Sequence, residues 1–164
     1  MDNQNNNTKK VLMICLGNIC RSPIAEAVFR RRIEQLGKTN DWLVDSAAAL
    51  VGEHTGKRPD KRALNILEKN HFCYDGRAGP ITKDDFFTFD YIFGMDKPNM
   101  ISLNKMKPKE SKAQLLMLGD YGLPVDDKII VDPYYLSGEE PFVKVYDQCV
   151  IACAEFLKQF YNAT

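Results

Sequence analysis

The chain has 164 residues, 45% of them hydrophobic, so it can bury one substantial core and gives no reason to expect a second domain. Its 22 Lys and Arg residues balance 22 Asp and Glu residues, which argues against nucleic acid or an anionic membrane as a partner. An odd number of cysteines, five, with no signal-peptide pattern and no apolar run long enough to span a bilayer, predicts a cytoplasmic protein with reduced thiols.

The first predicted element is a buried strand. Residues 1–10 are polar and rich in asparagine, so we expect a disordered leader before a domain that spans residues 11–161. Residues 11–14 are then apolar without alternation, which is typical of a central strand in a parallel sheet covered on both faces. Cys15 ends this strand.

A tight loop is expected after the strand. Gly17 and Asn18 tolerate unusual backbone angles, and Pro23 suits the first turn of a following helix. Such a loop can point several backbone N–H groups at one anion, and the positive end of the helix adds its partial charge. The sequence therefore predicts a phosphate cradle.

Cys15 and Arg21 bracket this cradle with the spacing Cys-x5-Arg, which places both side chains around one oxyanion. A thiolate is an effective nucleophile toward phosphorus, and a cation or a helix N-terminus stabilises it. The planar guanidinium of Arg21 suits phosphoryl oxygens, and the hydroxyl of Ser22 can donate a hydrogen bond to the sulfur. The alternative is a packed cysteine at a strand end, because the spacing alone is a common accident.

Helices and strands alternate along the rest of the chain. Asp60 and Thr82 are placed to cap the helices that follow them. We therefore predict an α/β fold, a single-domain doubly wound parallel sheet of about four strands with helices on both faces and the site at the carboxyl ends of strands. The expected helices are 23–36, 60–70, a short one near 82–87, 99–106 and 142–160, and the expected strands are 42–46, 91–95 and 114–118.

Phosphoryl transfer also needs an acid to protonate the leaving oxygen. Asp132 is the candidate because it follows an apolar pair and begins the run Asp-Pro-Tyr-Tyr. Pro133 stiffens this turn, and Tyr134 and Tyr135 offer aromatic surface to an aryl phosphate. From the residues alone, an Asp-Pro pair is more often an ordinary turn.

The run Cys-Leu-Gly-Asn-Ile-Cys-Arg-Ser-Pro at residues 15–23 resembles the signature of the low-molecular-weight protein tyrosine phosphatases. This resemblance implies hydrolysis of phosphotyrosine through a phosphocysteine, with Cys15 as nucleophile, Arg21 binding the oxyanion, and Asp132 as acid and then base. We expect phosphotyrosine-containing proteins as partners, no nucleic acid, no membrane, no cofactor or metal, and a monomer. The similarity continues in order through residues 45–47, 59–60, 89–92, 95–96, 132–135 and 145–149.

The resemblance also implies supporting roles for residues around the cradle. Ser46 is expected to hydrogen-bond Asn18 beneath the loop, and Asp96 is expected to be a structural carboxylate near the site. A reversible disulfide between Cys15 and Cys20 is implied under oxidation, which would protect the nucleophile. The expected substrate-binding residues are Leu16, Gly17, Asn18, Ile19, Cys20, Ser22, Tyr134 and Tyr135.

The chain departs from the family pattern at two places. The loop over residues 47–59 lacks the aromatic residue that usually forms one wall of the substrate cleft, which leaves the selectivity for phosphotyrosine partners open. The family often has a histidine and an arginine where Gly76 and Gly79 stand. The residues available to fill the missing wall are Leu50, Val51 and His54.

Two other functions fit parts of the sequence. Arsenate reduction on the same scaffold needs cysteines arranged as a redox relay, and Cys73, Cys149 and Cys153 form no clear relay because the last two belong to the apolar stripe of a terminal helix. A phosphotyrosine-binding module without turnover is the alternative from another class. The presence of both a nucleophile and an acid argues against it.

Overall fold

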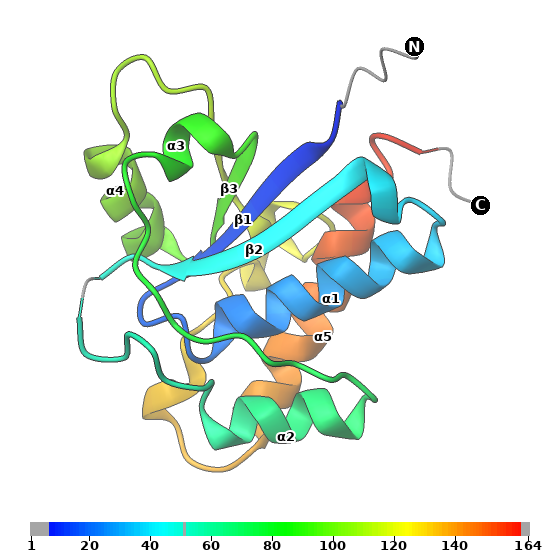
Figure 1. Cartoon of the computed structure of the whole chain (residues 1–164). Helices are drawn as coiled ribbons and strands as arrows, with labels where there is room; N and C mark the ends of the chain where they lie inside the picture. The colour runs from blue at the N-terminus through cyan, green and yellow to red at the C-terminus, as the bar shows by residue number, and fades with distance from the viewer. Residues whose placement is uncertain (1–6, 51, 162–164) are drawn as a thin grey trace.

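The computed structural model describes residues 7–50 and 52–161. One parallel sheet, ordered β2-β1-β3-β4, contains β1 (Lys9–Cys15), β2 (Trp42–Ala48), β3 (Tyr91–Gly94) and β4 (Gln114–Met117) (Figure 1). The expected α/β fold is therefore confirmed. Since β1 begins at Lys9, the last two residues of the expected leader belong to the sheet, and residues 1–6 lie outside the described residues.

Helices cover both faces of the sheet. On one face, α1 (Arg21–Gln35) and α5 (Glu140–Leu157) pack side by side with α2 (Lys61–Lys69) next to them (Figure 1). The other face carries α3 (Asp85–Thr88) and α4 (Lys97–Met106). Side chains alternate along β1, so Val11 and Met13 enter the first core whereas Leu12 and Ile14 enter the second. This double burial explains the continuous apolar run.

The larger core is built around one aromatic side chain of α5. Phe156 is 1% exposed, and its ring centroid lies 4.9 Å from that of Phe93 and 6.0 Å from that of Trp42. The indole Nε1 of Trp42 donates a hydrogen bond of 2.7 Å to Tyr161 Oη. The C-terminal helix is thus fixed against the sheet by rings that come from several elements, which also include Phe29, Tyr91, Tyr121 and Phe160.

Two aspartates fix the starts of helices beside the sheet. Asp60 caps α2 as predicted, because its side chain accepts a hydrogen bond of 2.8 Å from Arg62 N. Asp96 caps α4 in the same way, accepting from Asn99 N at 2.8 Å. The sequence placed the start of α4 at residue 99, two positions too late, because it did not identify Asp96 as the cap.

The strand order creates a crevice at one edge of the sheet. From β1 the chain crosses to β2 on one side and later to β3 on the other, so the connections leaving β1 and β3 diverge beyond their carboxyl ends.

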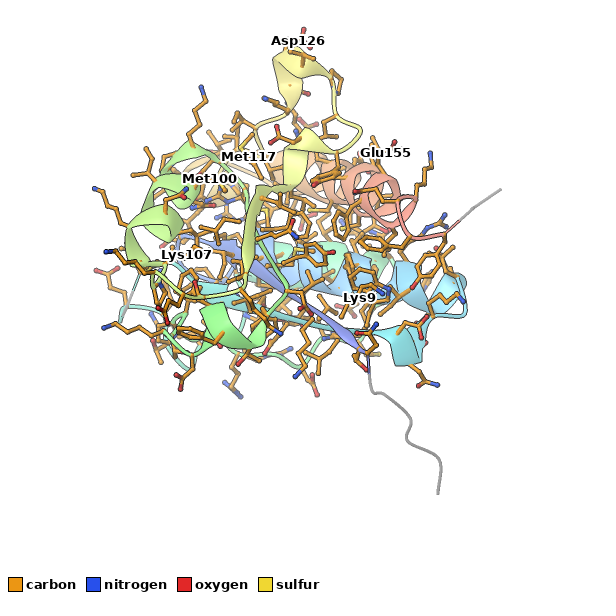
Figure 2. The ribbon with its side chains drawn as sticks, turned by 90° about the horizontal axis from the view of Figure 1, so that it is seen from above. Lys9, Met100, Lys107, Met117, Asp126 and Glu155 are labelled. Atoms are coloured by element: carbon orange, nitrogen blue, oxygen red, sulfur yellow. The ribbon has the colours of Figure 1, made fainter. Side chains whose placement is uncertain are left out.

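The segment around residues 125–127 projects from the body, with Asp126 at its tip (Figure 2). Within residues 7–50 and 52–161, no helix is both long enough and apolar enough to cross a membrane.

Candidate active site

The loop between β1 and α1 has the geometry of an anion cradle. Cys15 closes β1 and is 3% exposed, and Asn18 has a φ of 57°, in the left-handed region where asparagine is among the tolerated residues. α1 begins at Arg21, two residues before the expected Pro23, and its first turn holds no acidic residue. Because no side chain caps this helix, N–H groups at its start other than that of Ser22 remain available to an anion.

The nucleophile candidate has a donor beside it. Cys15 Sγ lies 3.0 Å from Ser22 Oγ, and Ser22 N donates to the same sulfur at 3.4 Å. Asn18 Nδ2 donates to Ser22 Oγ at 2.8 Å, which leaves the hydroxyl hydrogen of Ser22 free to point at the sulfur. Both Ser22 groups can thus stabilise a thiolate at Cys15.

Asn18 is held on both sides of its side-chain amide. Its Nδ2 also donates to Ser46 Oγ at 3.0 Å, which is the contact that the family resemblance implied. Its Oδ1 accepts a hydrogen bond of 3.1 Å from Gly79 N. These bonds fix the left-handed turn of the loop to β2 and to the segment that follows residue 76.

Sequence reasoning missed the buried carboxylate behind this turn. Glu26 is 5% exposed and accepts hydrogen bonds from Ser46 Oγ at 2.6 Å, Tyr74 Oη at 2.9 Å and Arg30 Nη2 at 2.8 Å. The signal was a glutamate within the apolar face of the helix predicted at 23–36. Burial and the nearby Glu26 charge raise the pKa of Tyr74, so its hydroxyl stays protonated as a donor. A side chain at Gly76 would collide with this phenol.

Arg21 connects the cradle to two other loops. Its Nη1 donates to Asp96 Oδ2 at 2.6 Å and to Ile130 O at 2.9 Å, and its Nη2 lies 3.4 Å from Asp132 Oδ2. Its side chain is 2% exposed, and its buried Nε has no hydrogen-bond partner among the described residues. Although burial alone lowers the pKa of Arg21, the charges of Cys15, Asp96 and Asp132 raise it. A charged donor is thus left over for an oxyanion.

Asp132 is held so that its carboxyl group faces the same space. Its Oδ1 accepts a hydrogen bond of 3.1 Å from Tyr134 N at the start of the short 3-10 helix Pro133–Tyr135, and its side chain is 22% exposed. The Asp-Pro-Tyr-Tyr run therefore forms a capped turn, which also aims the carboxyl group toward Arg21. The ordinary-turn interpretation of this run is therefore confirmed, and the role of Asp132 as an acid stays a prediction.

A cleft of about 420 Å³ opens over Cys15. Leu50 and His54 line one part of it, where the family usually has an aromatic wall, and the His54 ring lies 6.0 Å from the Tyr134 ring. Val51, the third residue considered for this wall, lies outside the described residues. Of the expected site residues, Asn18, Arg21 and Ser22 lie beneath the lining, whereas the lining itself includes Cys15, Leu16, Gly17, Ile19, Cys20, Asp132, Tyr134 and Tyr135.

All five cysteines are free. Burial, and next the charge of Cys15, raise the pKa of Cys20, so this neighbour of the nucleophile remains a thiol. Cys149 and Cys153 are core side chains of α5, as the sequence predicted, and burial raises the pKa of Cys149 to about 12. Cys73 is exposed. The cleft thus brings together a candidate nucleophile, Cys15, and a candidate acid, Asp132, with the Arg21 cation beneath them.

Comparisons with known proteins find relatives that cover nearly the whole chain. The family model described as low molecular weight phosphotyrosine protein phosphatase matches residues 10–163. Low molecular weight phosphotyrosine protein phosphatase 1 of Drosophila melanogaster is 54% identical over 153 residues, covering 92% of this chain and 96% of that protein. The crystal structure of Primo-1 has a TM-score of 0.90 at 53% identity and covers 93% of this chain and 98% of its own. The crystal structure of DARP, described as drosophila arginine phosphatase, has a TM-score of 0.87 at 34% identity. It covers 92% of this chain and 97% of its own.

Proposed function

The chain belongs to the family of low molecular weight phosphotyrosine protein phosphatases, and we propose that Cys15, Arg21 and Asp132 carry out its hydrolysis of phosphotyrosine. The enzyme is a cysteine-based protein tyrosine phosphatase. The observation that carries the assignment of residues is that Cys15 and Asp132 line one cleft, while Arg21 lies beneath it within 3.4 Å of Asp132.

In the first step, the Cys15 thiolate attacks phosphorus. An S–P bond forms while the bond between phosphorus and the phenolic oxygen breaks, and Asp132 transfers its proton to that oxygen. Arg21 and the loop N–H groups hold the phosphoryl oxygens as their charge redistributes. The products are a phosphocysteine, the free tyrosine hydroxyl and an ionised Asp132.

In the second step, water attacks the phosphocysteine. Asp132 takes a proton from the water, a new P–O bond forms, and the S–P bond breaks to return the thiolate. The Ser22 hydroxyl, 3.0 Å from Cys15 Sγ, stabilises the departing sulfur. Inorganic phosphate leaves, and Asp132 again carries the proton needed for the next cycle.

Hydrolysis of p-nitrophenyl phosphate with reductant and EDTA tests the residue assignment. We expect turnover by the wild-type chain and none by Cys15→Ser, and we expect Asp132→Asn to lower kcat by about 10²-fold or more. Acid quenching during turnover followed by mass spectrometry should locate the phosphoryl group on the peptide that contains Cys15. Wild-type activity in the folded Cys15→Ser protein would overturn the proposal, as would phosphate on another residue.

We also propose phosphotyrosine-containing proteins as substrates of a monomer that works in the cytoplasm. Tyr134 and Tyr135 at the cleft supply aromatic surface for a phosphorylated phenol, and five unpaired cysteines suit a reducing compartment. Matched peptides that carry phosphotyrosine, phosphoserine or phosphoarginine test the substrate class, and light scattering tests the monomer. Faster release of phosphate from phosphoarginine would contradict the choice of phosphotyrosine.

A further inference from the structure

A cation at the start of α2 holds the loop that carries the acid. Arg62 Nη1 donates to Leu136 O at 2.7 Å, and its Nη2 donates to Tyr134 O at 3.1 Å. Figure 1 shows the orange segment before α5 running beside α2. The two carbonyl groups flank the end of the turn that begins at Asp132, so one guanidinium fixes this turn from outside the cleft.

The guanidinium is itself fixed from two sides. Its Nε lies 3.1 Å from Asp60 Oδ1, and its Nη2 lies 3.2 Å from Asp60 Oδ2. The Arg62 Cζ lies 4.5 Å from the centroid of the Phe142 ring, and the Arg62 side chain is 26% exposed. Few orientations satisfy an aspartate fork, an aromatic ring and two carbonyl groups together, so the fork of Arg62 is pre-organised.

The same short stretch contacts the phosphate loop. Asp60 N donates a hydrogen bond of 2.8 Å to Ile19 O, which lies between Cys15 and Arg21 in sequence. Asp60 and Arg62 therefore join the loop of the nucleophile to the loop of the acid, although the two loops are far apart along the chain. Through these bonds, the distance between the loops is set by one folded unit.

We propose that Arg62 is a positioning residue that places Asp132 for proton transfer above Cys15. It acts through Tyr134, whose carbonyl group accepts from Arg62 and whose N–H donates to Asp132 Oδ1 at 3.1 Å. This inference rests on the proposed role of Asp132 as the acid. Since displacement of about 1 Å at a reacting group can cost about 10²-fold in rate, loss of the two carbonyl bonds should impair the acid while the cradle still binds phosphate.

The test compares a leaving group that needs the acid with one that needs it less. Phenolate is a poor leaving group and p-nitrophenolate a good one, so we measure single-turnover release of each phenol from its phosphate ester. We expect Arg62→Gln to slow release from phenyl phosphate by about 30-fold and from p-nitrophenyl phosphate by only about 3-fold. The inhibition constant for inorganic phosphate should stay within about 2-fold of the wild-type value. The matched control is Lys61→Gln on the exposed neighbour, which should change neither rate.

A double variant separates positioning from general damage. In an Asp132→Asn background, Arg62→Gln should slow release from phenyl phosphate no further, because the acid that it positions is already missing. Equal losses on the two esters, or losses that add to those of Asp132→Asn, would overturn the proposal. Should Arg62→Gln fail to fold, Arg62→Lys replaces it, since an ammonium cannot serve both carbonyl groups and should give the same selectivity.

The outcome for Asp132→Asn alone separates the two proposals. If this variant keeps the wild-type rate on phenyl phosphate, Asp132 is not the acid, and the positioning role falls with it. If Asp132→Asn is slow and Arg62→Gln matches the wild type on both esters, only the positioning proposal is wrong.

Discussion

A buried carboxylate sets the direction of the side-chain hydrogen bonds that lead to Cys15, the proposed nucleophile. Glu26 can only accept, so Ser46 donates to it at 2.6 Å and must itself accept from Asn18. The second amide hydrogen of Asn18 goes to Ser22, whose own hydrogen is left for Cys15. The orientation of the donor at the sulfur therefore depends on a charge three side chains away.

Tyr74→Phe tests the outer end of this hydrogen-bond network. The change removes one of the donors to Glu26 but leaves Ser46 in place, so we expect the free energy of unfolding to fall by about 1–2 kcal/mol and kcat to stay within about 3-fold. Urea unfolding and p-nitrophenyl phosphate turnover measure the two quantities. Ser46→Ala is the comparison, and it should lower kcat more because it breaks the path to Asn18. Equal kcat losses in the two variants would contradict this order of bonds.

Cys20 should form the protective disulfide with oxidised Cys15 only slowly at neutral pH. Peroxide converts the Cys15 thiolate to a sulfenic acid, and the Cys20 thiolate then attacks that sulfur, forms the disulfide and releases hydroxide. Burial raises the pKa of Cys20, and this effect remains after Cys15 has become a neutral sulfenic acid, so little Cys20 thiolate is present near neutrality. We expect the yield of the disulfide after a short peroxide pulse to rise from about pH 7 to about pH 9.

Mass spectrometry of alkylated, unreduced peptides measures this yield. The Cys20→Ser variant is the control, and its Cys15 should proceed to the sulfinic acid under the same pulse. A disulfide yield that is unaffected by pH would show that deprotonation of Cys20 does not limit the step.

At the scale of elements, the start of α2 is a pH-sensitive junction. Burial by itself raises the pKa of Asp60, but the hydrogen bonds from the Arg62 side chain and backbone hold it below its ordinary value. A lowered folded-state pKa contributes stability above the unfolded-state pKa of about 3.9, and this contribution disappears as the pH falls through the folded-state value.

Asp60→Asn should therefore destabilise the protein most near pH 7. The difference in unfolding free energy from the wild type should shrink once the pH falls below about 4, because the wild-type carboxylate is then protonated as well. Urea unfolding over a pH series measures it. Asp126→Asn at the exposed loop tip is the matched control and should give a small difference that does not vary with pH. A constant penalty for Asp60→Asn would mean that its charge contributes nothing.

The sequence could predict elements whose signals are local. The unbroken apolar run of β1, the cap at Asp60 and the apolar stripe of α5 each follow from neighbouring residues, and each is confirmed. The ion pair of Asp96 with Arg21 was harder to predict from the residues, because the two are 75 positions apart in the chain. Arg62 resembles any solvated charge on a helix, since its carbonyl acceptors lie more than 70 residues further on. Hydrogen bonds to acceptors that are distant in the sequence produce no periodic pattern, so the sequence alone does not predict them.

At the scale of the whole molecule, two cores share β1 but differ in content. The core beneath α1 and α5 is rich in aromatic rings, whereas the core beneath α3 and α4 is largely aliphatic. Phe156 contacts rings from α1, β2 and β3. It therefore joins the C-terminal helix to the rest of the fold.

Phe156→Ala should cost about 3–5 kcal/mol of unfolding free energy, because the removed ring leaves a cavity in a packed cluster. Urea unfolding followed by the fluorescence of Trp42, which is 4% exposed, measures this loss. The matched control is Phe87→Ala, since Phe87 is 47% exposed and should cost much less. Similar losses of unfolding free energy in the two variants would mean that the cluster around Phe156 does not stabilise the fold more than an exposed ring does.

The burial of Arg21 also limits how this chain can evolve. Arg21 joins the cradle to the cap of α4 and to the loop of Asp132, so its loss removes structure as well as chemistry. Cys15 ends a strand, and its sulfur is a small group at the floor of a cleft. A descendant that keeps the fold but abandons catalysis should therefore lose the cysteine before the arginine. Such a lineage would retain the anion cradle beside Arg21 and could use it to bind a phosphate group without turnover.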